Sequence, residues 1–283
     1  MAKLVSVIIP CFNQENFITE AIMSAVNQTY KNIEIVFIDD CSSDSSLQIA
    51  NNLKKQYSNI VILKNEVNRG VVYSRNRAID TANGFYIMPL DGDDTIEPTY
   101  IEKAVNIIEN NNDIGFVYCK VRKFGAVNKY WNLPEFNKEN FIFGNCIVNC
   151  SLFKKSDFIK VGKYKEYMNK WTEDYDLYLS FVEIGLVPYR IDEILFNYRI
   201  YNQSQRSNLT KKDPYYARRE CLLHHTKLYA DSRECIRRIF DPNYTCNYFK
   251  RERSLKKYKK ICLIEGITIL VLILFFFTYN FIL

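Results

Sequence analysis

The sequence predicts an α/β protein built on a mostly parallel sheet with helices on both faces. Two observations lead to this prediction. Within the first 120 residues, short runs of apolar and β-branched residues alternate with longer stretches whose apolar residues recur every three or four positions. The runs are typical of buried strands and the stretches of amphipathic helices. Strands that alternate with helices form βαβ units, in which the strands are parallel and the helices cover the sheet.

Each element is justified by its own pattern. The predicted strands are short, apolar runs at residues 4–9, 33–38, 60–63, 85–90 and 114–118. The predicted helices lie between them at residues 16–28, 45–57, 71–83 and 98–110, the last beginning with a proline, as helices often do. Beyond about residue 120 the pattern is less regular, although the later half of residues 170–185 is typical of a helix that ends at Gly185.

Composition and charge exclude some classes of protein. The chain has 283 residues, of which 48% are hydrophobic, enough for a substantial core. Its net charge of +6 comes from residues 250–260, where seven basic residues and one Glu give 7 − 1 = +6. The remaining 31 basic and 31 acidic residues balance (38 − 7 and 32 − 1). A basic patch confined to one short segment argues against a nucleic-acid-binding domain.

The cysteines and the amino terminus indicate the cytoplasm. The nine cysteines are odd in number and show neither CxxC nor Cys/His metal-binding spacing. We therefore expect free thiols in a reducing compartment. The first residues carry no long apolar stretch of the kind that forms a signal peptide.

The carboxyl-terminal segment has a different character. Residues 261–283 are almost entirely apolar and would form a helix about 34 Å long, against a hydrocarbon core of about 30 Å. The basic residues before it place its flank on the cytoplasmic face of a membrane. A buried helix, or one lying in the membrane interface, is the alternative. The predicted organisation is a catalytic-type domain at 1–205, a helical extension at 206–249, a basic juxtamembrane segment at 250–260 and an anchoring helix at 261–283.

Acidic clusters follow two of the predicted strands. "DDCSSDSS" (39–46) follows the second strand and "DGDD" (91–94) follows the fourth. Ligands of parallel sheets bind at the carboxyl ends of the strands, so both clusters face one crevice. The chain has no glycine-rich phosphate-binding motif, which favours phosphate held through a metal ion. Asp91 and Asp93 are therefore predicted to bind Mg²⁺ or Mn²⁺, hard cations that prefer carboxylate oxygens.

Five motifs in order resemble the family-2 glycosyltransferases. They are "VSVIIPCFNQENFI", "QTYKNIEIVFIDDCSSDSS", "NRGVVYSRNRAIDTANGFYIMPLDGDD", "NCSLFKK" and "WTEDYDLYLSFVEIG". The resemblance covers roughly residues 4–205 and implies the GT-A fold, a Rossmann-like sheet. It also implies a nucleotide-sugar donor, a divalent metal and inversion at the anomeric carbon.

The resemblance also implies roles for particular residues. The expected nucleotide-sugar-binding set is Pro10, Phe12, Asn13, Glu15, Asp40, Arg75, Asp91 and Gly92. Within it, Asp40 matches the residue that recognises the base of a UDP-type donor, and Arg75 matches a position that faces the diphosphate. Asp91 and Asp93 match the metal motif, and Asp174 of "TED" matches the catalytic base. Tyr201 stands where relatives often have a histidine.

Several of these side chains also have purely structural explanations. Ser43 and Asp44 are suited to cap the helix near residue 45. Arg75 and Arg77 would then be solvated helix charges, and Glu173 and Asp174 first-turn acids favoured by the helix dipole. His224 and His225 are adjacent and are expected to be structural, not metal ligands.

The predicted reaction transfers a sugar to a hydroxyl acceptor, a membrane-associated glycan or glycolipid of cell-surface polysaccharide synthesis. One alternative is a polyprenyl-phosphate sugar synthase, whose ionised acceptor needs no base. The other is a catalytically silent nucleotide-sugar-binding scaffold, which would not need both "DGDD" and "TED". The absence of a Q-x-x-R-W stretch argues against a processive synthase.

Overall fold

The computed structural model describes residues 2–168, 172–201 and 220–233. The chain divides into two units, Met1–His225 and Thr226–Leu283. The described part of the second unit, residues 226–233, contains one short helix, α10 (Thr226–Ala230). The first unit contains the sheet.

The first half of this unit follows the predicted alternation. Its strands are β1 (Val5–Cys11), β2 (Ile33–Asp39), β3 (Ile60–Lys64) and β4 (Tyr86–Pro89), and its helices are α1 (Ile18–Val26), α2 (Ser46–Lys54), α3 (Val71–Thr81) and α4 (Tyr100–Asn110). Every residue of β1, β2 and β4 is buried, which explains why these strands are mostly apolar; the buried polar residues Ser6 and Glu34 hydrogen-bond to each other. A two-residue strand, β5 (Thr95–Ile96), follows β4 and has no counterpart in the prediction.

The sheet is mixed, which corrects the prediction of a mostly parallel one. Its order is β3-β2-β1-β4-β8-β6-β9-β5, with β7 (Lys129–Trp131) paired to β6 (Ile114–Gly125). The first four strands are parallel, but β8 (Leu152–Lys154) lies antiparallel between β4 and β6. The three residues of β8 are too few to show a strand period, so no pattern in the sequence indicates that they separate β4 from β6.

The longest strand, β9 (Val187–Ile200), was not predicted. It runs parallel to β6, and the pairing shifts register around Lys120. Pro188 and a run of exposed charged residues interrupt its alternation, so the sequence does not show the period of two that marks a strand. The helix predicted in the later half of residues 170–185 is present as α7 (Glu173–Glu183); it begins earlier than predicted and ends before Gly185, whose φ of 88° suits a glycine. The remaining short helices are α5 (Lys138–Phe141), α6 (Lys155–Lys160) and η1 (Glu166–Met168).

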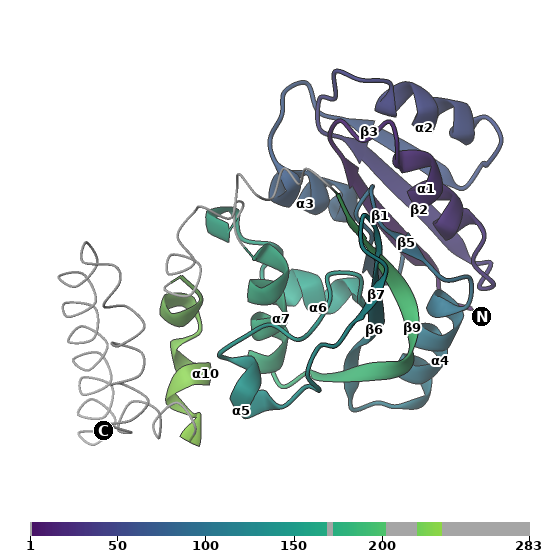
Figure 1. Ribbon diagram of the computed structural model, residues 1–283. Helices are drawn as coiled ribbons and strands as arrows, with labels where there is room; N and C mark the ends of the chain where they lie inside the picture. Colours follow the sequence, from purple (N-terminus) through teal and green to yellow (C-terminus); the bar gives the residue numbers. More distant parts are fainter. Residues whose placement is uncertain (1, 169–171, 202–219, 234–283) are drawn as a thin grey trace. The chain divides into compact units, whose positions relative to one another are not determined.

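Helices cover both faces of the sheet, as predicted. In Figure 1, α1, α2 and α4 lie on one face, and α3, α6 and α7 lie on the other. The aromatic core under α7 includes Phe116 of β6 stacked on Tyr178 of α7, with ring centroids 5.4 Å apart. Phe181 of α7 also packs against Phe116, with ring centroids 5.4 Å apart. This packing sets the position of α7, and with it the position of Asp174, against the sheet.

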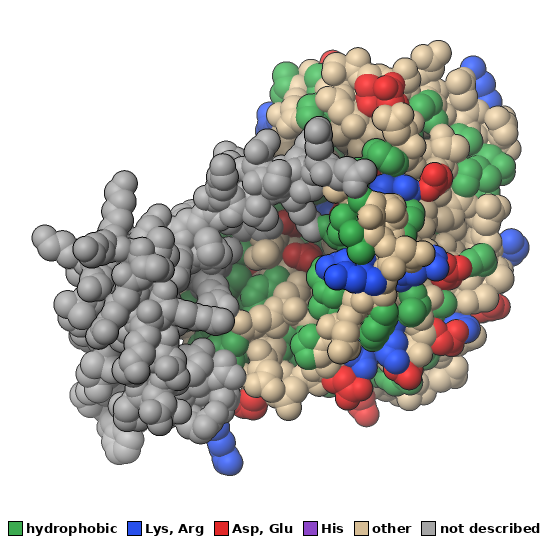
Figure 2. Space-filling model, in the orientation of Figure 1, with side chains coloured by type: hydrophobic (Ala, Val, Ile, Leu, Met, Phe, Trp, Pro, Cys, Tyr) green, Lys and Arg blue, Asp and Glu red, His purple; other side chains and the backbone are tan. Residues whose placement is uncertain are grey.

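Figure 2 shows Lys and Arg side chains gathered over the β6 and β7 strands. On β6, Lys120 pairs with Asp192, and Arg122 lies 3.7 Å from Glu97; on the neighbouring strand β9, Arg190 lies 2.7 Å from Glu135.

Two further predictions concern the chain as a whole. The six cysteines among the described residues are free thiols, as expected. Within the described ranges, no helix has the length and apolar character needed to cross a membrane. The predicted anchor at 261–283, the basic segment at 250–260 and most of the extension at 206–249 lie outside the described residues.

Candidate active site

Two loops at the carboxyl ends of β1 and β2 are fastened to each other. The backbone N–H of Ser43 donates to Asn13 Oδ1 (2.8 Å), and the N–H of Asn13 donates to Ser42 Oγ (3.0 Å). The N–H of Ser45 donates to Glu15 Oε2 (2.9 Å). Asn13 has a left-handed φ of 54°, which asparagine tolerates well. The predicted binding residues Asn13 and Glu15 therefore build the paired loops themselves.

Two other predicted residues flank this loop pair. Pro10 lies within β1 and pairs with Ile38 of β2. Phe12 is 47% exposed, so its ring is available to stack on a ligand. Asp44 Oδ1 accepts from the N–H of Ser46, the first residue of α2 (2.9 Å), but the residue at the N-cap position is Ser45, so neither Ser43 nor Asp44 is the cap that was suggested.

Asp40 is buried and holds a third loop. Its carboxylate accepts from Asn65 Nδ2 (2.7 Å), from the N–H of Arg69 (2.9 Å) and from the N–H of Gly70 (2.8 Å). Gly70 has a φ of 84°, a conformation that favours glycine. Asp40 thus fixes residues 65–70 beside the paired loops, and its contact with a nucleotide base stays a prediction.

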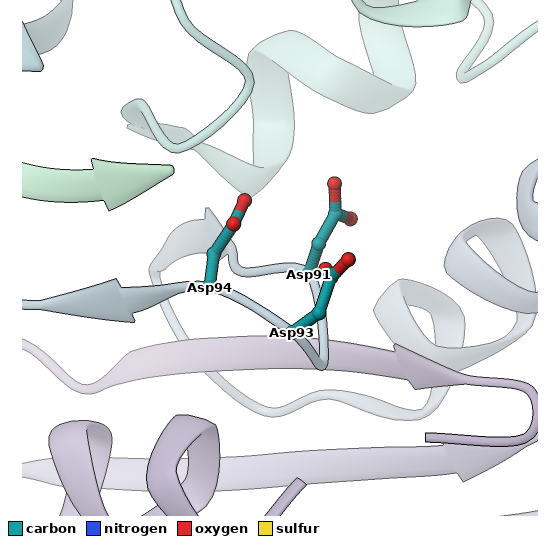
Figure 3. Close-up of side chains that lie close together, drawn as sticks. All are labelled: Asp91, Asp93 and Asp94. Carbon is teal, nitrogen blue, oxygen red and sulfur yellow. The ribbon is translucent and has the colours of Figure 1, made fainter. Parts of the chain in front are cut away.

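The "DGDD" turn carries three carboxylates on one side of the loop after β4 (Figure 3). Asp91, Asp93 and Asp94 each offer an oxygen, and these oxygens lie within 4.8 Å of one another. A side chain at Gly92 would place Cβ 2.3 Å from Gln14 Oε1 and 3.1 Å from the Pro10 carbonyl oxygen. A side chain there would displace the Gln14 amide and crowd the Pro10 carbonyl, so glycine suits the close approach of this turn to the β1 loop. Clustered carboxylate oxygens fit a hard divalent cation.

Residues at and just after the end of β9 form hydrogen bonds with this turn. The N–H of Arg199 donates to Asp94 Oδ1 (2.7 Å), and Arg199 Nε donates to the carbonyl oxygen of Asp93 (2.7 Å). The hydroxyl of Tyr201 donates to Asp93 Oδ2 (2.6 Å). Burial and the adjacent Asp93 raise the pKa of Tyr201, so its hydroxyl stays a donor. Asp94 is buried and serves the turn, whereas Asp91 and Asp93 remain partly exposed.

Arg199 was missed by the sequence analysis. Tyr201 was noted only as a departure from the family. Their roles depend on contacts with residues more than 100 positions earlier in the chain. The one available signal was the "YRIY" stretch itself, at the end of an apolar run.

Arg75 joins the acidic turn to α7. Its side chain is 3% exposed, and its guanidinium lies 2.5 Å from Asp91 Oδ1 and 2.5 Å from Glu173 Oε1. Burial alone would lower the pKa of Arg75, but the two carboxylates raise it well above the usual value. Arg75 is thus a buried, paired charge and not a solvated helix charge. Its predicted contact with a diphosphate stays a prediction.

Asp174 lies in the first turn of α7, next to this ion-pair bridge. Its Oδ1 accepts from the N–H of Tyr175 (2.8 Å). Burial raises the pKa of Asp174 to about 7, helped by the negative charge of Glu173 and opposed by Arg75. A carboxylate with a pKa near neutrality is suited to act as a general base.

The fold and site together define a sugar-transferring enzyme of a known family. The sequence profile of Glycosyl transferase family 2 matches residues 6–171. The chain belongs to glycosyltransferase family 2, and it is a glycosyltransferase.

The relatives are bacterial and archaeal. An uncharacterized glycosyltransferase of Methanocaldococcus jannaschii is 30% identical over 76% of this chain and 77% of its own length. TuaG of Bacillus subtilis, named for teichuronic acid biosynthesis, is 29% identical over 74% of this chain and 83% of its own. The chondroitin synthase of Escherichia coli is 27% identical over 71% of this chain but only 29% of its own.

Solved structures agree on the fold. TarS of S. aureus in complex with UDP-GlcNAc matches 92% of this chain and 75% of that chain, with a TM-score of 0.67 and 18% sequence identity. At this identity the match establishes a common GT-A-like fold and nothing finer.

Proposed function

We propose that the protein transfers a sugar from a nucleotide-sugar donor, UDP-linked, to a hydroxyl group of a membrane-associated glycan or glycolipid, with inversion. The observation that carries this proposal is the bridge made by Arg75. One buried guanidinium pairs with Asp91 of the acidic turn and with Glu173, the neighbour of Asp174. A group suited to hold the donor phosphates and a group suited to activate a hydroxyl are thereby held at one site.

The donor side is supported by the acidic turn and the loops beside it. Asp91 and Asp93 would hold Mg²⁺ or Mn²⁺, while Tyr201 and Arg199 keep the turn in place. When bound, such a cation neutralises the charge of the departing diphosphate. Phe12, with its exposed ring, would stack on the base next to Asn13. That TarS has been solved with UDP and with UDP-GlcNAc supports a UDP-linked donor for a protein of the same fold.

The acceptor side is supported by Asp174. In its ionised form it accepts the proton of an acceptor hydroxyl while that oxygen forms the new bond to the anomeric carbon and the diphosphate leaves with the bonding electrons. Attack from the face opposite the leaving group inverts the anomeric centre, and no covalent enzyme intermediate forms. A polyprenyl-phosphate acceptor is already ionised and would have no proton for Asp174 to remove.

The substitution Asp174→Asn tests this assignment. We expect transfer to fall by roughly 10²–10⁴-fold, the usual contribution of a positioned general base. Donor affinity, measured by calorimetry with a UDP-sugar, should stay near wild type. Asp157→Asn is the matched control, because Asp157 is also an acid in the first turn of a helix. Unchanged transfer in Asp174→Asn would favour the lipid-phosphate synthase, and absence of transfer in both wild type and variant would favour the scaffold.

We further propose that the protein is held at the cytoplasmic face of a membrane by residues 261–283. The proposal rests on the apolar composition of this segment and the seven basic residues directly before it. The full chain should sediment with membranes, and a chain truncated after residue 260 should move to the soluble fraction. The proposal fails if the full chain stays in the supernatant without detergent.

A further inference from the structure

The helix that carries Asp174 has a second cluster of charged side chains. His225 follows a helical turn at residues 220–224. Its Nδ1 lies 2.9 Å from Glu183 Oε2, and its Nε2 lies 3.2 Å from Asp176 Oδ1. The side chain of His225 is 4% exposed and that of Asp176 is 1% exposed. A buried imidazole therefore lies between two carboxylates of α7.

This arrangement selects the charged form of the ring. A neutral imidazole has one N–H donor and one lone pair, so it satisfies only one of the two carboxylates and directs its lone pair at the other. An imidazolium donates to both. Burial by itself disfavours the positive charge, but the hydrogen bonds to Asp176 and Glu183 outweigh it and raise the pKa of His225 above its usual value.

Asp176 depends on this contact. Its Oδ1 also accepts from the hydroxyl of Tyr167 (3.3 Å), and its Oδ2 has no hydrogen-bond partner among the described residues. A buried carboxylate that loses a charged donor is left with an uncompensated charge, which is costly. The neighbouring ring of Tyr167 stacks on His224 at 4.1 Å, so residues 220–225 contact both α7 and η1.

We propose that His225, as an imidazolium between Asp176 and Glu183, is a positioning residue that fastens residues 220–225 to α7 and so holds the helix that presents Asp174. The importance of this contact for transfer rests on the proposed function. The contact itself does not depend on donor, metal or acceptor.

The sign of the pH dependence follows from the surroundings of His225. The charged and titratable groups near it are Asp176 and Glu183 of α7, Asp174 further along that helix, Lys165 and Tyr167 around η1, and Glu220, Cys221 and His224 on its own turn. A histidine with a raised pKa in the folded protein contributes stability that is complete below the usual histidine pKa. That contribution is lost as the pH rises through the raised value. The contact of His225 with Asp176 and Glu183 should therefore weaken as the pH rises above the range in which an ordinary histidine loses its charge.

Histidine NMR tests the first half of the proposal on the wild-type chain. The protein has only two histidines, so the full chain labelled at histidine, in detergent where solubility requires it, gives two ring signals. His224→Gln removes one and assigns the other. We expect His225 to titrate above pH 6.5 and to show both ring nitrogens protonated below its pKa. A titration at or below 6.5 would overturn the proposal.

Hydrogen exchange of the α7 amides, residues 173–183, tests the second half. With rates corrected for intrinsic chemistry, protection in the wild type should fall through the His225 titration, about tenfold for each unit by which its pKa is raised. His225→Gln should lack the part of this pH dependence that follows the His225 titration and should show lower protection than the wild type below it, and His224→Gln should match the wild type. Equal protection in His225→Gln and the wild type would contradict the inference. If His225→Gln loses protection but Asp174→Asn keeps full transfer, the inference about His225 stands and Asp174 is removed from the mechanism.

Discussion

The loops on the donor side and the first turn of α7 are held in place by different chemistry. The loops after β1 and β2 are joined by hydrogen bonds from backbone N–H groups, such as that of Ser43 to Asn13. Asp40 likewise receives two backbone N–H groups and one amide. The start of α7 is held instead by charge, through Arg75 between Asp91 and Glu173.

The loops after β1 and β2 form a hydrogen-bonded region, whereas the start of α7 forms the tuned region, whose geometry depends on charge. In the loops the hydrogen-bond donors are uncharged backbone N–H groups and the Asn65 amide, although Glu15 and Asp40 accept through carboxylates. In the tuned region, polar atoms of Arg75, Asn149 and Tyr164 are buried with no hydrogen-bond partner among the described residues, next to an Asp174 whose pKa is near 7. Buried polar groups are normally paired, and exceptions are common at catalytic sites. Removing the charge of Arg75 or Glu173 should therefore disturb the start of α7 more than it disturbs the paired loops after β1 and β2.

The largest effect is expected from Asp93→Asn. The substitution removes the charge of a metal ligand while the side chain keeps its shape. Because a bound metal contributes several kcal/mol of charge stabilisation, we expect transfer to fall by roughly 10²–10⁴-fold. Transfer rates with Mg²⁺ and Mn²⁺ measure it. Asp113→Asn, at an exposed acid, is the control. Full activity of the wild type in EDTA, or of Asp93→Asn, would contradict the metal assignment.

A smaller effect is expected from Tyr201→Phe. The ring stays against Phe17, whose centroid lies 5.0 Å away, but the hydrogen bond to Asp93 is lost. Loss of a group that orients a metal ligand typically costs 10–100-fold in metal affinity. Electron paramagnetic resonance of free Mn²⁺ measures this without an activity assay. Tyr189→Phe, which removes the hydroxyl of an exposed tyrosine, should bind Mn²⁺ as the wild type does. Affinity within twofold of wild type in Tyr201→Phe would show that Asp93 needs no such partner.

The donor side could be predicted from the sequence because its determinants are local. The strands β1 to β4 are short and mostly apolar, and the acidic clusters directly follow two of them. Parallel strands bring those clusters to one edge of the sheet without any knowledge of side-chain contacts. The positions of Asp91 and Asp93 at a common site followed from this alone.

The α7 side could be named but not assembled from the sequence. The motif around Asp174 was identified, yet its link to the acidic turn runs through Arg75 and Glu173, 98 residues apart. Arg199 acts through its backbone N–H and Nε on a turn 106 residues earlier, a contact that no local pattern announces. Strand β9, which carries Arg199, is itself obscured by a proline and a register shift. Long-range pairing of charges and strands is therefore what the sequence left undetermined.

The smallest expected effect is a pH dependence of transfer in the wild-type protein, which should affect the α7 side and not the donor loops. If the pKa of Asp174 is about 7, its ionised, active form is lost as the pH falls below 7, and kcat/KM for transfer should drop by about tenfold per pH unit there. The affinity for a UDP-sugar should stay constant between pH 6 and 8, since the groups that donate the hydrogen bonds of these loops are backbone N–H groups, which do not titrate in this range. In Asp174→Asn the residual transfer should lose this dependence. Because the folded pKa of Asp174 exceeds that of the unfolded chain, its ionisation also opposes folding, so this group removes stability as the pH rises from about 4 to 7. An activity limb near pH 4 would mean that burial does not tune Asp174, and a donor affinity that follows the same limb would mean that the two regions are not electrostatically distinct.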